Sequence, residues 1–410
     1  MEIERYALAR GESVFVGFSR LSKFLPFWFI FSTFAGFAWP GIVAASAKLI
    51  GAIFGITETH FIAIGMLLLM GAILTLGPVL YKTVERFSML LIGFGVPAIF
   101  ALVLYLADGA DWSALLNGLA GLGEGYRFLP AGIPIASFLA AFAFSGAGGN
   151  LNLAQSYYIK EKGYGMGKYS GRITSILTGK AEEIKLVGTH FEMNKENLGH
   201  FRKWWRLINL EHAIVFWLTG AFAICILALL AYATAYGTAT PAGGIEFVLH
   251  EAAAIASRVT PMVGTIFLIL GGLMLFSTQM TVLDATSRIM SENLLIIKKK
   301  WEHRSLPKIY YSFLWAQILA GTIIFLTNLR EPLALLIIEA VINAGAMFVH
   351  IGLTTILNQK LLKKEVRPGA FRLAIIISPI PIQPSAKLKI IIHLIAIAAA
   401  QPPQPSREFM

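Results

Sequence analysis

The chain has 410 residues, of which 56% are hydrophobic and only 14% are charged. Its mean hydropathy is +0.69, and a soluble domain does not carry so many apolar runs of membrane-spanning length. Composition therefore predicts an all-α polytopic membrane protein. A formal charge of +11 is compatible with nucleic-acid binding, but the basic residues lie in loops where they set membrane orientation instead. The single cysteine, Cys225, excludes an intrachain disulfide and a zinc–thiolate cluster.

Eight apolar runs are each long enough to span a hydrocarbon core of about 30 Å. They cover residues 27–50, 61–81, 87–107, 133–156, 213–235, 261–286, 309–327 and 333–357. A ninth run, 373–395, is a poor span because three prolines and two lysines interrupt it. We therefore expect a transmembrane domain over residues 1–375 and a divergent tail over 376–410.

The N-terminal segment, residues 1–21, is charged and amphipathic and lacks the apolar core of a cleavable signal peptide. In the first span, Trp39-Pro40-Gly41 predicts a kink, because proline has no N–H to donate to the helical ladder. Lys48 follows in the same span, and its long side chain is expected to reach outward to water.

Basic residues gather in alternate loops. Threading the spans from a cytoplasmic N-terminus places 27 of the 34 Lys and Arg residues inside, whereas the outside loops hold only Arg127, Arg258 and Arg330. The positive-inside rule then predicts a multi-pass protein of the cell (inner) membrane with a cytoplasmic N-terminus.

The run at 133–156 is expected to be a membrane helix that breaks halfway across. Its apolar part reaches Phe144, and the residues that follow include Gly146, Gly148, Gly149, Asn150, Asn152 and Gln155. Glycine loses the most backbone freedom on ordering, so the helix should unwind there. Close packing of two helices is the alternative explanation for such glycines.

Unwound backbone within a bilayer persists only where protein, water or a bound solute satisfies its polar groups. Carbonyl groups freed between Phe144 and Ala147 would suit a cation, and the amide oxygens of Asn150 and Asn152 would add neutral ligands. The sequence therefore predicts a cation site at this break.

Two connecting segments carry further expectations. The loop at 108–132 is expected to hold a short helix on the outer side. Before the fifth run, FRKWWRLINLEH (201–212) is basic, aromatic and amphipathic, and we expect it to lie at the headgroup interface.

Polar residues recur at spacings of three and four in the sixth run, at Ser277, Thr278, Thr281, Asp284 and Ser287. This spacing puts most of them on one helical face, which we expect to point away from lipid. Asp284 and Arg288 are four residues apart, so a mutual ion pair and a role in coupling or gating are both open.

In the eighth run Glu339, Asn343, Met347 and His350 share a helical face. Ionisable and amide side chains are costly inside a membrane, which makes them candidates for ion or proton handling. A single residue of this kind more often forms a hydrogen bond between helices. We assign Asn343 to the predicted cation site, and Glu339 and His350 to coupling or gating.

The residue patterns do not indicate an enzyme. No His/Glu pair has metalloprotease spacing, and Ser145, the most tempting nucleophile, comes without a partner histidine motif.

Four segments carry a resemblance: MEIERYALARGESVFVGF, GAGGNLNLAQSYYIKEKGYGMGKYSGR, STQMTVLDATSRIMSENL and VINAGAMFVHIGLTTILNQKLL. In this order, over residues 1–375, the chain resembles the Nramp (natural resistance-associated macrophage protein) family of divalent metal transporters, in its divergent bacterial branch. The resemblance implies a leucine-transporter-like inverted-repeat fold of the APC superfamily, with a broken helix in each repeat at the substrate site. It also implies that the first two helices are missing and that the sequence is N-terminally truncated.

The family's sixth helix carries Met-Pro-His-Asn. If its Asn corresponds to Asn150, Ala147 and Gly149 stand at the Met and His positions; if it corresponds to Asn152, Asn150 lies near the metal. Either way the thioether and the imidazole are missing. A metal site at Ala147, Asn150 and Asn152 would then use oxygen ligands only, which favours magnesium- or calcium-like ions, or manganese with lower selectivity.

We therefore expect a secondary transporter that moves divalent metal cations of the manganese, iron or magnesium class, with proton coupling left open. No cofactor is expected beside the transported cation, and the partners would be membrane lipid and the metal ion, not nucleic acid. An amino-acid or other solute permease of the same fold, and a non-transporting membrane fragment, are the alternatives. The expected ion-binding residues are Phe144, Gly146, Ala147, Asn150, Asn152 and Asn343.

Overall fold

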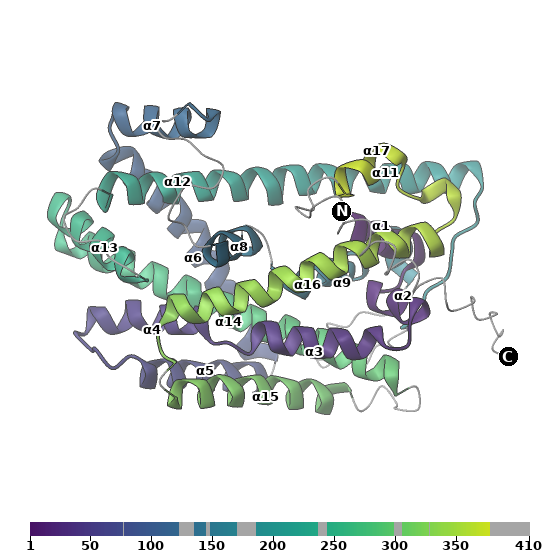
Figure 1. The fold of residues 1–410 in the computed structure, drawn as a ribbon, viewed down its shortest axis with the longest axis horizontal. Coiled ribbons are helices and arrows are strands. Elements are labelled where there is room, and N and C mark those ends of the chain that lie inside the picture. Colours follow the sequence, from purple (N-terminus) through teal and green to yellow (C-terminus); the bar gives the residue numbers. More distant parts are fainter. Residues whose placement is uncertain are drawn as a thin grey trace.

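The computed structural model describes residues 1–76, 78–122, 135–144, 148–169, 186–236, 244–298, 306–327 and 329–377. Within these ranges every regular element is helical (Figure 1). Six helices are long and apolar enough to cross a membrane, at Leu25–Ile53, Met89–Leu106, Lys195–Thr234, Pro261–Ile297, Pro307–Leu326 and Pro332–Leu361. The chain is thus a helical, multi-pass membrane protein, as its composition predicts.

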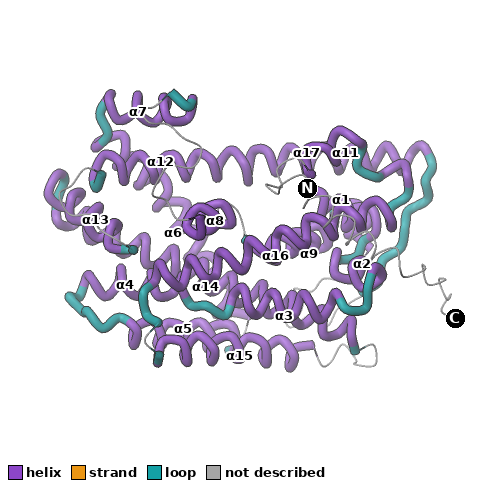
Figure 2. The backbone as a smooth tube through the Cα atoms, in the orientation of Figure 1, coloured by secondary structure: helices purple, strands orange, loops and turns teal. Residues whose placement is uncertain are grey.

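Helices fill most of the described chain, and most of the loops between them are short (Figure 2). The first half contains α1 (Glu2–Arg10), α2 (Val14–Leu21), α3 (Leu25–Phe37), α4 (Gly41–Ile53), α5 (His60–Thr75), α6 (Pro78–Leu106), α7 (Gly109–Ala120), α8 (Ile135–Phe144), η1 (Gly149–Ala154), α9 (Gln155–Lys162) and η2 (Gly165–Tyr169). The second half contains α11 (Lys195–Glu211), η3 (His212–Leu218), α12 (Thr219–Thr234), α13 (Glu246–Arg258), α14 (Pro261–Ile297), α15 (Leu306–Leu326), α16 (Pro332–Leu361), η5 (Lys364–Val366) and α17 (Ala370–Ile377).

Local sequence explains where several helices begin. Proline stands in the first turn of α3, α14 and α16, where its missing N–H costs nothing. Thr260 caps α14 by accepting a hydrogen bond from the Val263 N–H. Asp108 and Asp111 form a capping box at the start of α7, which is the short helix expected in the 108–132 loop.

Several predicted span boundaries differ from the structure, and two of the differences lie at prolines. The run at 27–50 is interrupted at Pro40, so it forms α3 and α4, and the predicted kink is confirmed as a break. The run at 61–81 ends too late, because α5 stops at Thr75 and α6 begins at Pro78. Proline is favoured in the first turn of a helix, so Pro78 starts a new helix rather than extending the old one.

The prediction that residues 201–212 lie at the headgroup interface stays a prediction. In the structure these residues belong to a helix that runs without interruption from Lys195 to Thr234 through the π-helical turn η3. The reason is packing: Phe201 and Ile208 are buried against the start of the chain, which holds α11 in line with α12. The tail prediction lies outside the described residues from position 378 onward.

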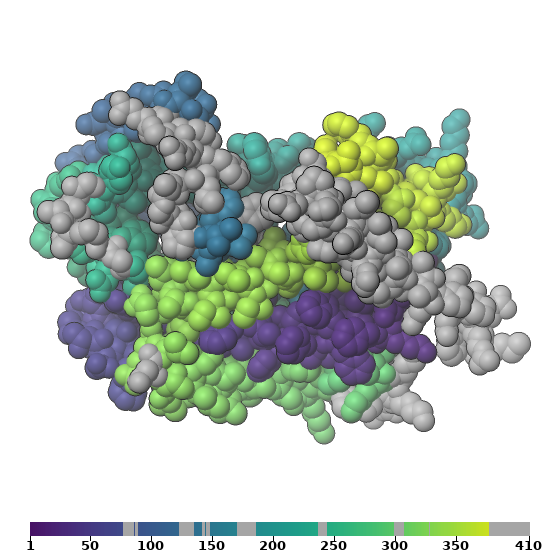
Figure 3. Space-filling model, in the orientation of Figure 1, coloured from purple at the N-terminus to yellow at the C-terminus, as the bar shows by residue number. Residues whose placement is uncertain are grey.

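The long helices run side by side along the longest axis of the molecule (Figure 1). On the face drawn in Figure 3, α16 lies directly against α3. At one end, α1, α2 and α9 gather around a cluster of buried aromatic side chains that includes Tyr6, Phe15, Phe18 and Phe29. This end, called the basic end below, carries the segments that the positive-inside rule predicts to be cytoplasmic.

Glu12 organises the basic end. Its side chain is fully buried, and its two carboxylate oxygens accept from the Tyr6 hydroxyl at 2.6 Å, Arg20 Nη2 at 2.7 Å and the Gly188 N–H at 2.8 Å. Arg10 Nε lies 3.4 Å away. A buried carboxylate is stable only with such a set of donors and countercharges.

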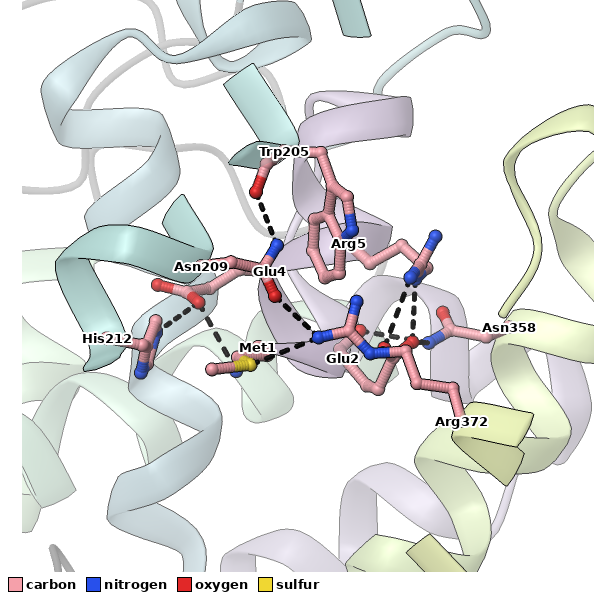
Figure 4. A network of polar contacts seen from close by, with 9 residues as sticks. All are labelled: Met1, Glu2, Glu4, Arg5, Trp205, Asn209, His212, Asn358 and Arg372. Carbon is pink, nitrogen blue, oxygen red and sulfur yellow. Dashed lines mark hydrogen bonds and ion pairs between the residues drawn. The ribbon is translucent and has the colours of Figure 1, made fainter. Parts of the chain in front are cut away.

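A second polar network joins the chain start to three later helices (Figure 4). The Trp205 ring contacts two guanidinium groups, with Arg5 Cζ 3.9 Å and Arg372 Cζ 4.7 Å from the ring centre. Glu2 pairs with both arginines, at 2.7 Å and 3.3 Å. The network, which includes Asn358 of α16, thereby ties α1 to α11, α16 and α17. Its remaining members are Met1, Glu4, Asn209, His212 and Asn358.

Candidate functional site

The α-helix predicted to break after Phe144 does break. α8 ends at Phe144, and the described chain resumes with Gly148 and Gly149 at φ values of 36° and 52°, followed by the 3-10 helix η1. Positive φ values are readily adopted only by glycine, which explains the glycines at these positions. The predicted ligands Gly146 and Ala147 lie outside the described residues. Phe144 is partly buried in a small apolar cluster with Ala340 of α16.

A second interruption, between α3 and α4, lies next to the first. Pro40 has no N–H, so the carbonyl of Gly36 loses its normal partner one turn later. The Asn343 side chain replaces that partner, because its Nδ2 donates to the Gly36 oxygen at 3.0 Å. The preceding carbonyl, that of Ala35, accepts from the Trp39 indole at 3.0 Å. The end of α3 is therefore capped by side chains.

The Asn343 amide is wedged between the two interruptions. A Cβ atom at Gly149 would lie 2.0 Å from Asn343 Oδ1, and one at Gly36 would lie 2.4 Å from it. Only glycine leaves room for the amide at either place. Since the Gly36 carbonyl can only accept, the nitrogen of the amide must face it, which turns the oxygen toward Gly149. That oxygen is buried and has no hydrogen-bond partner within the described ranges.

Asn150 has the same arrangement. It is fully buried, and its Nδ2 donates to the Ser32 hydroxyl at 2.8 Å and the Thr33 hydroxyl at 2.9 Å, both on α3. Its Oδ1 has no partner among the residues that the structure describes. Asn152, by contrast, is only half-buried. The structure therefore places Asn150 and Asn343, and not Asn152, at the meeting point of α3, η1 and α16.

His350 and Glu339 flank Asn343 on α16. His350 Nε2 lies 3.1 Å from the Gly149 carbonyl oxygen, so Nε2 carries the proton, and the buried Nδ1 faces no partner in the described part of the chain. Glu339 is buried one turn before Asn343, and its Oε2 is likewise without a described partner. A carbonyl freed by the break is thus satisfied by a histidine of the neighbouring helix.

Asp284 and Arg288 form the mutual ion pair that their spacing allows. Arg288 Nη2 lies 2.9 Å from Asp284 Oδ2, and the Tyr310 hydroxyl donates to Asp284 Oδ1 at 2.7 Å. Arg288 also reaches Glu161 of α9 at 3.5 Å. The pair thus links α14 to α15 and to the helix that follows the break.

The prediction that the polar face of the sixth run avoids the surface is wrong in part. Asp284 and Ser287 are buried, but Thr278 and Thr281 are exposed. Each threonine hydroxyl donates to the carbonyl four residues earlier, at 2.8 Å and 3.0 Å. A threonine whose hydroxyl bonds within its own helix does not need a polar neighbour. The spacing of the polar residues therefore predicted a larger buried face than the structure has.

Sequence reasoning missed the contribution of α3, namely Ser32, Thr33 and the carbonyl of Gly36. The available signal was the hydroxyl pair in the apolar run FIFSTFAGF, followed by the helix-breaking Trp39-Pro40-Gly41. No group of three or more His, Cys, Asp or Glu side chains that could hold a metal occurs in the described ranges. No protein-family model matches this chain, and no curated protein matches it.

Proposed function

We propose that this protein is a secondary transporter of divalent metal cations with a leucine-transporter-like inverted-repeat fold. One observation carries the proposal: two buried amides, of Asn150 and Asn343, use their N–H groups on α3 and leave both oxygens without described partners beside a broken membrane helix. Amide oxygens are neutral, hard ligands of the kind that divalent cations bind. Broken helices are where transporters of this architecture bind ions.

The charge that such a cation needs is supplied by Glu339. This carboxylate is buried on α16 four residues before Asn343, a rise of about 6 Å along the helix. Its Oε2 has no partner among the described residues, which supports a role as the anionic ligand or as the group that gives up a proton when the cation arrives. Since the described donors contain oxygen and no thioether, the site favours magnesium, calcium or manganese over softer metals.

Transport also requires the site to open toward each side in turn. η1 and α9 are separated from α8 by the positive-φ glycines, so they can tilt while α8 stays packed against α16. The Gly149 carbonyl, held by His350, is the contact that such a tilt would loosen. The exposed threonines of α14 do not enter this proposal.

Uptake into proteoliposomes that contain the full chain tests the proposal, with manganese, magnesium and calcium supplied separately. We expect saturable uptake of at least one metal, and a loss of about tenfold or more in apparent affinity for Asn150→Ala and Asn343→Ala, equivalent to about 1.4 kcal/mol. Asn152→Ala is the matched control and should keep wild-type uptake. Wild-type uptake by the N150A/N343A double variant would overturn the site assignment. Competition by amino acids instead of metals would favour the permease alternative.

A further inference from the structure

The helix from Lys195 to Thr234 is longer than a membrane is thick. Its 40 residues extend over about 60 Å at 1.5 Å per residue, whereas a hydrocarbon core takes about 30 Å. The apolar part, η3 and α12, fills that core, so α11 extends beyond it at the basic end. Figure 1 shows this helix along one edge of the bundle.

One face of α11 packs against the rest of the protein. Phe201 and Ile208 are buried, Trp205 contacts the guanidinium groups of Arg5 and Arg372, and the Trp204 ring stacks on Tyr164 with ring centres 4.7 Å apart. These contacts fix the rotation of the helix about its axis. The opposite face is therefore held outward.

That outward face carries a basic cluster made of Arg202, Lys203 and Arg206. All three side chains are exposed, and none has a hydrogen bond or ion pair to another residue in the described ranges. Arg206 is four residues from Arg202 and three from Lys203, so the like charges face one another along the helix surface. Such like-charge pairs destabilise a helix unless an anion neutralises them.

The same face becomes apolar toward the span. Leu207 and Leu210 are 44% and 57% exposed, and Ile214 follows one turn later at 49%. Their spacing of three and four residues continues the line from Lys203. A cationic group at headgroup level followed by exposed leucines at acyl-chain level matches the two parts of a phospholipid.

We propose that an anionic phospholipid of the phosphatidylglycerol type binds along this face of α11. Its phosphate lies against the guanidinium groups of Arg202 and Arg206, which suit bidentate contact with phosphate oxygens, and against Lys203. Its acyl chains lie over Leu207, Leu210 and Ile214. This proposal does not depend on the transported substrate.

Native mass spectrometry of the full chain, released from nanodiscs of equal phosphatidylcholine and phosphatidylglycerol, measures which lipid is retained. We expect the wild type to retain phosphatidylglycerol selectively. In R202Q/K203Q/R206Q the retention of this lipid should fall by about tenfold or more. R202K/R206K keeps the charge and should retain most of the binding. Lys195→Gln, which removes one charge from the same helix farther from the span, should change nothing.

Three outcomes would overturn the proposal. The first is equal retention by the wild type and the triple variant, provided that both unfold at the same temperature in phosphatidylcholine alone. The second is a loss in Lys195→Gln as large as that in the triple variant, which would indicate a non-specific charge effect. The third is full displacement of the lipid by inorganic phosphate, which would show that the acyl chains contribute nothing.

Discussion

The helix interruptions in the middle of the molecule and the Glu12 network at the basic end are both polar and buried, but they are held together by different forces. Around the interruptions the contacts are neutral: an amide on a carbonyl, an amide on two hydroxyls, an imidazole on a carbonyl. At the basic end a carboxylate meets two arginines. Neutral hydrogen bonds contribute about 1 kcal/mol each, whereas breaking a buried ion pair costs about 3–5 kcal/mol. The middle is therefore the easier part to rearrange, and the basic end is the fixed part.

The largest effect is expected at Glu12. Glu12→Gln removes the charge that Arg20 and Arg10 face, and it places an amide N–H₂ against groups that are already donors. We expect a loss of about 3 kcal/mol or more in the free energy of unfolding. Chemical unfolding in detergent, followed by tryptophan fluorescence, measures it. Glu365→Gln, at an exposed carboxylate, is the control and should stay within about 0.5 kcal/mol of the wild type. Similar stabilities for the two variants would contradict the view that the basic end is held by charge.

An intermediate effect is expected at Asn343, and a double-mutant cycle isolates its cause. Asn343→Ala leaves the Gly36 carbonyl buried without a donor, which should cost about 1–3 kcal/mol. Pro40→Ala restores an N–H at the position where that carbonyl would find its helical partner. We therefore expect Asn343→Ala to cost less in the Pro40→Ala background, with a coupling energy of about 0.5–3 kcal/mol.

Additive effects of these two substitutions would show that Asn343 does not compensate for the proline.

Replacing Asn343 by Asp separates its structural role from a role in metal binding. Its carboxylate cannot donate to the Gly36 carbonyl, so stability should fall as it does for alanine, while the added negative charge should raise metal affinity if Asn343 is a ligand. Parallel measurements of unfolding and uptake separate the two roles.

The smallest effect is expected from the pH response of His190 at the basic end. Burial, followed by the nearby charges of Arg10, Lys363 and Arg20, lowers the pKa of His190 to about 4. Below pH 6.5 the unfolded chain takes up a proton at this histidine that the folded chain does not accept, so stability falls as the pH drops toward 4. Thermal unfolding at pH 7 and pH 5 should show this decrease, and it should be smaller in His190→Gln. An unchanged pH dependence in the variant would exclude His190 as its source.

Much of the fold could be predicted from the sequence because membrane spans depend on long apolar runs, which are visible without tertiary contacts. The break after Phe144 was predicted because glycines in a membrane helix have a direct backbone consequence. Boundaries were less accurate where one proline decides between ending a helix and starting the next, as at Pro78. The continuity of α11 with α12 depends on contacts with residues near the chain start, which no local pattern records.

The sequence predicted the two amides of the candidate site but not the residues that orient them. Asn150 and Asn343 stand out as amides in apolar runs, but the partners that orient them, Ser32, Thr33 and Gly36, are more than a hundred residues away in the chain. Spacing also could not distinguish Asn150 from Asn152, because their difference in burial arises from the turn at Gly149. Threonines such as Thr278 were wrongly predicted to lie on a buried face, because a threonine hydroxyl can form its hydrogen bond within its own helix.

The wedge of the Asn343 amide between two glycines also constrains how this sequence can diverge. A side chain added at either glycine collides with the amide. A smaller residue at position 343 should therefore precede any replacement of Gly36 or Gly149. Substitutions at these three positions, which are spread across 308 positions of sequence, are thus expected to depend on one another.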